Sequence, residues 1–215
     1  MQNNITTDGL NQIINHLRYR IRGYSFREVS VDEIGLVKDY TLIDVQNAAK
    51  KMLHHMSMPG YTPIIELVDL PDRIAGLTNL NDSKIVYISL DKKRFNTKYY
   101  SIPQLLTIIA HELCHKFLWV HGIKEMSKII EYMTDACVVY VGFGKIMIQG
   151  VNVTEFSLTH LAFIVKSVGY LEKWQIAYLR NVCYNIPIPF TLREWSRSFI
   201  NVFMSLFQKE KLLDS

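Results

Sequence analysis

Two histidines and a glutamate near the middle of the chain have the spacing of a zinc-binding helix. His111, Glu112 and His115 form the pattern H-E-x-x-H within an apolar segment. Residues four apart on an α-helix lie on one face, so both imidazoles can bind a single Zn²⁺ ion. Glu112 would lie beside the metal, where it can take a proton from a water molecule that zinc activates. The pattern therefore predicts a catalytic zinc site.

The side chains around this motif are apolar, which predicts a largely buried helix. Two adjacent buried imidazoles and a buried carboxylate are costly unless they share a partner. A bound cation is therefore favoured over simple packing of the histidines. The apolar neighbours are Leu106, Ile109, Ala110, Leu113 and Phe117.

A catalytic zinc site needs a third protein ligand and an open position for water. Glu131 and Asp135 lie four residues apart on the next predicted helix. Glu131 could bind the metal while Asp135 accepts a hydrogen bond from the outer nitrogen of a histidine ligand. Such an acceptor would hold the imidazole in one tautomer and orientation.

His121 is the alternative third ligand, because H-E-x-x-H with a further His six residues on is the metzincin spacing. Metzincins have Gly at the position of Leu118, where the chain must turn to bring the third histidine round. If the helix continues through Leu118, His121 faces away from His115. A position at the end of the helix is then expected for His121.

The helix that carries the motif has recognisable ends. Ser101 and Gln104 have the spacing of a capping box, with Pro103 in the first turn. Gly122 can end the helix about twenty residues later. We therefore expect one helix from about residue 101 to residue 121.

The remaining segments predict an α+β arrangement. Three short segments rich in β-branched residues lie between residues 61 and 91 and predict three sequential strands of a small antiparallel meander. Residues 154–168 are compatible with strand or helix. Further helices are expected at about 8–22, 41–57, 125–143, 172–185 and 192–209.

Composition and charge are those of an ordinary globular domain. The chain has 215 residues, of which 49% are hydrophobic and 20% are charged, which excludes a disordered or low-complexity protein. Three cysteines without close spacing predict no disulfide framework. No signal-peptide pattern and no apolar run of about 20 residues is visible. We expect a cytoplasmic protein without a membrane span.

The formal net charge of +4 is small and dispersed, so it gives no reason to expect a nucleic-acid partner. Residues 92–98 are the one basic segment that could contact nucleic acid or an acidic peptide. A solvent-exposed loop is the expected structure there.

The pair of motifs His111-Glu112-x-x-His115 and Glu131-x-x-x-Asp135 resembles the gluzincin group of zinc metallopeptidases. That group includes thermolysin-like, HtpX-like and ImmA/IrrE-like enzymes. The resemblance covers about residues 60–145, and the short interval between the motifs suits a small member. It implies a zincin-like α+β fold in which a small antiparallel sheet of about three strands packs on the motif helix and the rest is mainly helical.

The length of the chain predicts a single domain, and the resemblance implies what this domain does. A single domain would contain N-terminal helices (1–60), the sheet and zinc-binding core (61–145) and a C-terminal helical region (146–215). One catalytic Zn²⁺ would be held by His111, His115 and Glu131, with Glu112 as general base. The expected substrate is a peptide or protein, whose extended chain could pair with an edge of the sheet.

Enzymes of this kind usually place one further donor near the developing oxyanion. Tyr132, His160 and Tyr170 are candidates, and the sequence does not select among them. Two other functions stay open: a non-catalytic or regulatory zinc-binding protein that acts through a partner, and a protease associated with nucleic acid. The presence of Glu112 favours an enzyme, since a purely structural site needs no water activator. The sequence assigns no oligomeric state.

Overall fold

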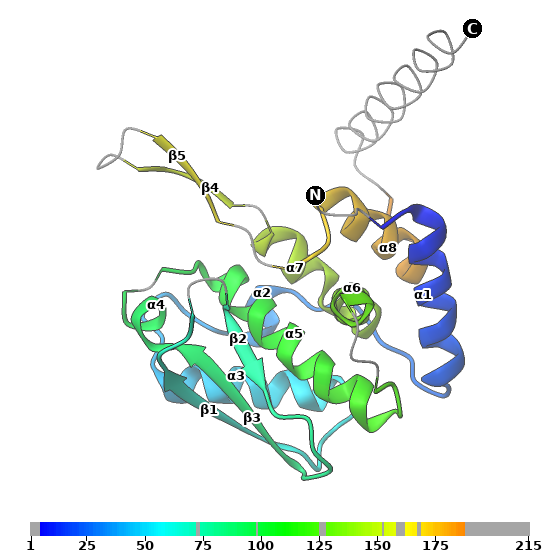
Figure 1. The fold of residues 1–215 in the computed structure, drawn as a ribbon, viewed down its shortest axis with the longest axis horizontal. Helices are drawn as coiled ribbons and strands as arrows, with labels where there is room; N and C mark the ends of the chain where they lie inside the picture. Colours follow the sequence, from blue (N-terminus) through cyan, green and yellow to red (C-terminus); the bar gives the residue numbers. More distant parts are fainter. Residues whose placement is uncertain are drawn as a thin grey trace, which may run out of the picture.

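A three-stranded mixed sheet and the helices beside it form the α+β fold of this protein (Figure 1). The computed structural model describes residues 5–71, 74–97, 99–124, 128–151, 153–157, 162–166 and 169–187. The strands are β1 (Thr62–Val68), β2 (Gly76–Thr78), β3 (Ile85–Asp91), β4 (Val153–Ser157) and β5 (Ala162–Lys166). The α-helices are α1 (Thr7–Arg20), α2 (Val31–Ile34), α3 (Leu42–His55), α4 (Lys92–Asn96), α5 (Ile102–Val120), α6 (Lys128–Val138), α7 (Gly144–Gly150) and α8 (Lys173–Tyr184). The predicted helix at 192–209 lies outside the described residues.

The sheet has the order β1-β3-β2. β1 runs parallel to β3, with Thr62 opposite Ile85, whereas β2 runs antiparallel to β3, with Leu77 opposite Ser89. The three strands lie where the sequence predicts them, but the predicted antiparallel meander is wrong. The sheet is mixed because the chain crosses from one side of β3 to the other between β1 and β2.

Two polar contacts hold this crossing in place. The Asp91 carboxylate accepts a hydrogen bond from the amide of Leu70 at 3.3 Å, and the Arg94 guanidinium donates to the carbonyl of Ile74 at 3.0 Å. Leu70 and Ile74 belong to the connection between β1 and β2, while Asp91 is the last residue of β3 and Arg94 lies in helix α4 directly after it. The side chains that favour the crossing therefore come from a later part of the chain.

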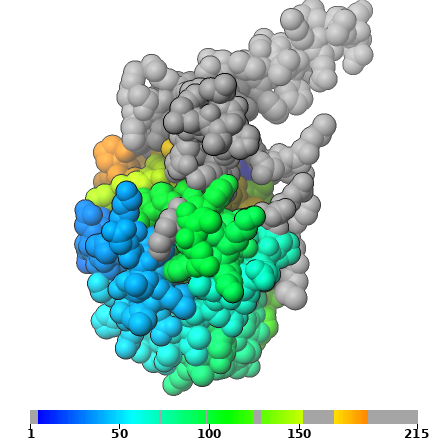
Figure 2. Space-filling model, turned by 90° about the vertical axis from the view of Figure 1, so that its left-hand side faces the viewer, coloured from blue at the N-terminus to red at the C-terminus, as the bar shows by residue number. Residues whose placement is uncertain are grey.

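Residues 92–98 contain helix α4 and not the predicted solvent-exposed loop. Asp91 caps the helix by accepting from the amide of Arg94 at 2.7 Å, and Phe95 is buried. Arg94 also donates to the Tyr100 hydroxyl at 3.1 Å. Figure 2 shows the green segment around residue 100 at the surface of the molecule. Arg94 is therefore engaged within the fold, while Lys92 and Lys93 are exposed.

Helices α3 and α5 cover one face of the sheet (Figure 1). Val86 and Ile88 of β3 point to this face and are fully buried, while Ile85 and Tyr87 point to the opposite face and are exposed. This alternation is the period of two residues that a half-buried strand requires. The hydrophobic core therefore lies between the sheet and α5.

Helix α5 begins and ends as the sequence predicts. The Ser101 amide donates to the Gln104 side chain at 3.0 Å, which completes the capping box, and a proline occupies the first turn. The helix ends at Val120, and Gly122 follows with a φ of 75°. Thirteen of its 19 residues are buried, and α5 is a central element on which α3, α6 and α7 pack.

One buried cation ties α5 to the turn between β2 and β3. The ammonium of Lys116, which is fully buried, donates to the backbone carbonyl of Asn81 and to its side-chain oxygen at 3.3 Å. Burial lowers the pKa of Lys116. Trp119 adds a hydrogen bond to Asp82 at 3.2 Å. These contacts hold β2 against the motif helix.

The predicted helix at 125–143 is divided into α6 and the π-helix η1 (Val139–Phe143), and α7 follows at once. Gly142 in η1 has a φ of 101°, a conformation that L side chains rarely adopt. A β-carbon there would lie 2.1 Å from the Arg27 carbonyl oxygen. The Val29 amide bonds the Gly142 carbonyl at 2.9 Å. The segment after α1 therefore lies directly against the end of α6.

Beyond residue 146, the region predicted to be helical also contains strands. β4 and β5 form an antiparallel pair with Val153 opposite Lys166, so the described residues of the stretch 154–168, which the sequence left open between strand and helix, form strands. α8 follows where a helix is predicted. Within the part of the chain that the structure describes, no helix combines the length and the apolar character that crossing a membrane requires.

Replacing Gly142 by Ala should destabilise the fold by about 2–4 kcal/mol, because the methyl group meets the Arg27 backbone in a strained conformation. Gly60→Ala is the matched control, since nothing lies within 4 Å of a β-carbon at that glycine. Urea unfolding of both variants measures the difference. Equal unfolding free energies for Gly142→Ala and wild type would contradict this packing.

Candidate metal centre

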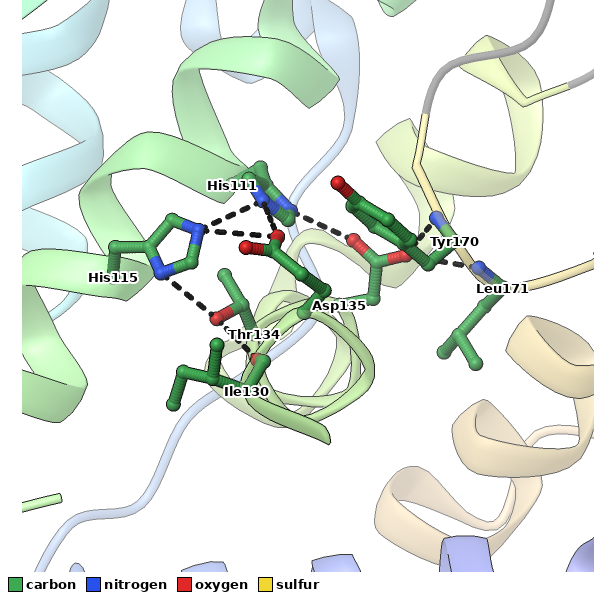
Figure 3. A network of polar contacts seen from close by, with 8 residues as sticks. His111, His115, Ile130, Thr134, Asp135, Tyr170 and Leu171 are labelled. Atoms are coloured by element: carbon green, nitrogen blue, oxygen red, sulfur yellow. Dashed lines mark hydrogen bonds and ion pairs between the residues drawn. The ribbon is translucent and has the colours of Figure 1, made fainter. Parts of the chain in front are cut away.

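Three side chains from two helices converge on one point (Figure 3). His111 and His115 lie one turn apart on α5, and Glu131 lies in the first turn of α6, which packs against α5. One nitrogen or oxygen atom from each lies within 4.8 Å of the others. The structure thus brings together the two histidines of the motif and the carboxylate predicted as third ligand.

The distances between these atoms fit a zinc ion. The two Nε2 atoms of His111 and His115 are 3.0 Å apart, and Oε2 of Glu131 lies 3.1 Å from the first and 3.4 Å from the second. A tetrahedral site with ligand distances of about 2.0–2.1 Å has ligand atoms about 3.3 Å apart. Two imidazoles and one carboxylate are also the donor set of a catalytic zinc site with one open position.

The outer nitrogen of His111 is bound to Asp135, as the sequence predicts. Asp135 Oδ1 lies 2.8 Å from Nδ1 of His111, and its side chain is fully buried. The other oxygen, Oδ2, accepts from the backbone amides of Tyr170 and Leu171 at 2.5 and 2.9 Å. Because two amides donate to it, the carboxylate remains an acceptor and His111 donates from Nδ1. Nε2 is then the nitrogen that faces Glu131.

The carboxylates around the site control its protonation in the metal-free protein. Burial alone would lower the pKa of His111, but the hydrogen bonds to Asp135 and Glu131 outweigh it and raise the pKa to about 10. The hydrogen bond from His111, together with the nearby imidazole of His115, holds the pKa of Glu131 well below its usual range. A proton on His111 therefore occupies the position where a metal cation would bind.

Glu112 lies beside this cluster and faces strand β2. Its side chain is buried, and desolvation raises its pKa, although the neighbouring histidines oppose the shift. A β-carbon on Gly76 of β2 would lie 3.1 Å from Oε1 of Glu112 and 2.9 Å from Ile108 of α5. Glycine at this position leaves room for the carboxylate between the motif helix and the edge of the sheet.

His121 does not belong to the cluster. It caps the end of α5, where its Nδ1 donates to the Phe117 carbonyl at 2.8 Å and its ring packs on Phe117 at 4.2 Å. Its ring also contacts Tyr24. Because α5 continues through Leu118 without a break, the chain does not make the turn that a metzincin third ligand needs.

The three candidate oxyanion donors have different positions. Tyr170 packs its ring on His111, with centroids 5.9 Å apart and an angle of 25° between the planes (Figure 3). The ring centroid of Tyr132 lies 6.2 Å from that of Tyr170. His160 lies outside the described residues. Tyr170 is therefore a candidate whose ring packs directly on a histidine of the cluster.

Thr134 is a site residue that the sequence reasoning did not identify. Its Oγ1 lies 3.2 Å from Nδ1 of His115 and 2.7 Å from the Ile130 carbonyl. Its position three residues after Glu131 is the available signal, because residues i, i+3 and i+4 share a helix face. Apart from this spacing, the sequence around Thr134 has no pattern that identifies its hydroxyl as part of a site.

No protein-family model matches the chain, and no curated protein or solved structure matches it either. The class of this protein is therefore inferred from its own residues and their geometry.

Zinc binding should release about one proton at pH 7.5. His111 carries a proton below its pKa of about 10 in the metal-free protein, and the metal needs the lone pair of that nitrogen. The apparent zinc affinity should therefore rise with pH until about pH 10. Titration calorimetry in two buffers with different ionisation enthalpies measures the released proton.

His121→Ala is the control, since that residue lies outside the cluster, and it should keep wild-type stoichiometry and proton release. His115→Ala should lose stoichiometric zinc. Identical binding heats in the two buffers, or full zinc binding by His115→Ala, would contradict this assignment.

Proposed function

We propose that this protein is a zinc-dependent metallopeptidase of the gluzincin type. The proposal is carried by one observation: two Nε2 atoms and one carboxylate oxygen converge at tetrahedral spacing, with the buried carboxylate of Glu112 next to them. His111, His115 and Glu131 would hold the metal. A site with a purely structural role has no use for the buried acid group beside it.

Bound zinc would supply a Lewis acid that polarises a carbonyl group and makes water acidic. Glu112 would take the proton from the attacking water and pass it to the leaving amine. Its buried position supports this role, because desolvation moves the pKa of the carboxylate toward neutral pH, where general bases are most effective. Asp135 would keep His111 oriented through both steps.

Strand β2 offers a place for an extended substrate. It is an edge of the three-stranded sheet, and Gly76 within it adjoins Glu112. A peptide that adds to this edge would run past the catalytic carboxylate and the metal ligands. The other edge strand, β1, has Pro63 and an Ile65 amide that donates to Gln46 at 3.5 Å, so β2 is the edge better suited to pairing.

Tyr170 is the residue that we propose as the oxyanion donor. Its ring stacks on His111, and burial raises the pKa of its phenol, helped by the negative charges of Glu131 and Asp135. A phenol with a raised pKa keeps its proton and can donate a hydrogen bond. The two backbone amides that bind Asp135 hold this segment next to the metal ligands.

Glu112→Gln should bind zinc normally and lose at least about 10²-fold in the rate of cleavage of an unstructured protein such as casein, since the general base is removed without a change of shape. Glu66→Gln, on an exposed position of β1, is the matched control and should cleave at the wild-type rate. Full activity in Glu112→Gln would refute the mechanism. A zinc-loaded wild type that cleaves no peptide in a diverse library would favour the non-catalytic alternative.

Tyr170→Phe should lower kcat by about 10²-fold with little change in KM, because an oxyanion donor acts chiefly in the transition state. Tyr132→Phe removes a hydroxyl from a neighbouring tyrosine and serves as its control. Steady-state kinetics on one peptide substrate separates the two parameters. A loss confined to KM, or an equal loss in Tyr132→Phe, would overturn the role of Tyr170.

A further inference from the structure

The hydroxyl of Thr134 has two neighbours, and only one arrangement of its hydrogen satisfies both. Oγ1 lies 2.7 Å from the carbonyl oxygen of Ile130 and 3.2 Å from Nδ1 of His115. A carbonyl oxygen can only accept, so the single hydroxyl hydrogen points to Ile130. The lone pair of Oγ1 must then accept a hydrogen bond from Nδ1–H of His115.

This arrangement decides the tautomer of His115. With a hydrogen on Nδ1, the neutral ring has its lone pair on Nε2. The hydrogen bond made by Nδ1 therefore leaves Nε2 as the nitrogen that can bind a metal. That Nε2 atom faces His111 and Glu131 at 3.0 and 3.4 Å. Thr134 is fully buried, so water does not compete for the bond.

We propose that Thr134 is a positioning residue of the metal centre, which holds His115 in the ligating tautomer as Asp135 holds His111. The inference rests on the proposed zinc site and adds the residue that orients its second histidine. Thr134 and Asp135 follow Glu131 by three and four residues on α6. They therefore lie about 60° to one side of Glu131 and about 40° to the other. One face of α6 supplies a ligand and an acceptor for each histidine.

The two acceptors differ in charge, which suits a site that already holds several carboxylates. Asp135 pairs its charge with His111 and with two backbone amides. A second buried carboxylate beside His115 would face Glu131 and Asp135 without such donors, and like charges at short range are costly. A neutral hydroxyl orients the ring without adding charge.

Replacing Thr134 by Val, which has nearly the same shape, tests this role. The variant should bind zinc about 10- to 100-fold more weakly in competition with a chelator, as is typical when a partner of a metal-binding histidine is lost. Thr134→Ser keeps the hydroxyl and should stay within about threefold of the wild-type zinc affinity. Thr107→Val is the matched control, because Thr107 is also buried and donates to the Pro103 carbonyl at 2.7 Å but has no hydrogen bond to a histidine among the described residues.

The tautomer itself can be measured on the metal-free protein at pH 8. Nitrogen-15 NMR of the imidazoles, assigned with His115→Asn, should show the Nδ1–H form of His115 in wild type and Thr134→Ser and a loss of that preference in Thr134→Val. Wild-type zinc affinity in Thr134→Val would overturn the proposal, and so would an Nε2–H tautomer in the wild type. The two readouts need no peptidase activity, so they stand apart from a failure of the proposed function.

Discussion

The buried carboxylate of Asp135 is the interaction on which the site depends. It lies on α6, accepts from His111 on α5 and binds two backbone amides just before α8. A fully buried charge is tolerable only when its oxygens are satisfied, and here three N–H groups from two other parts of the chain do so. This one group therefore joins the motif helix, the helix that carries Glu131 and the segment that carries Tyr170.

The rest of the centre follows from the packing of α6 on α5. Because Glu131, Thr134 and Asp135 share one face of α6, the same contact that brings a ligand to the histidines also brings both of their outer partners. The inner nitrogens are left facing one another and a carboxylate. In the metal-free protein the hydrogen bonds from His111 to Asp135 and Glu131 outweigh the effect of burial, so the pKa of that residue is raised.

The sheet has a second role beyond covering α5. Lys116 and Trp119 bind the turn between β2 and β3, so the motif helix itself sets the position of the edge strand. Gly76 then fits against Glu112 with no room for a side chain. The proposed general base and the proposed docking edge are held together by residues of one helix.

Much of the site could be predicted from the sequence because it depends on local spacing. The pairs His111–His115 and Glu131–Asp135 are each four apart, and a helix with clear caps places such pairs on one face whatever the rest of the fold does. The meeting of the two helices, the position of His121 outside the cluster and the stacking of Tyr170 on His111 depend on packing between distant segments. The mixed pairing of the sheet could not be predicted for the same reason. Asp91 and Arg94 hold the connection between β1 and β2 in place through contacts that leave no local pattern in the sequence.

The sequence by itself determined the types of the candidate ligand side chains and their spacing along each helix. Only the tertiary structure decided which atoms meet. The spacing of residues along a helix sets the direction in which their side chains point, whereas the distances between helices depend on the burial of side chains that are far apart in the chain.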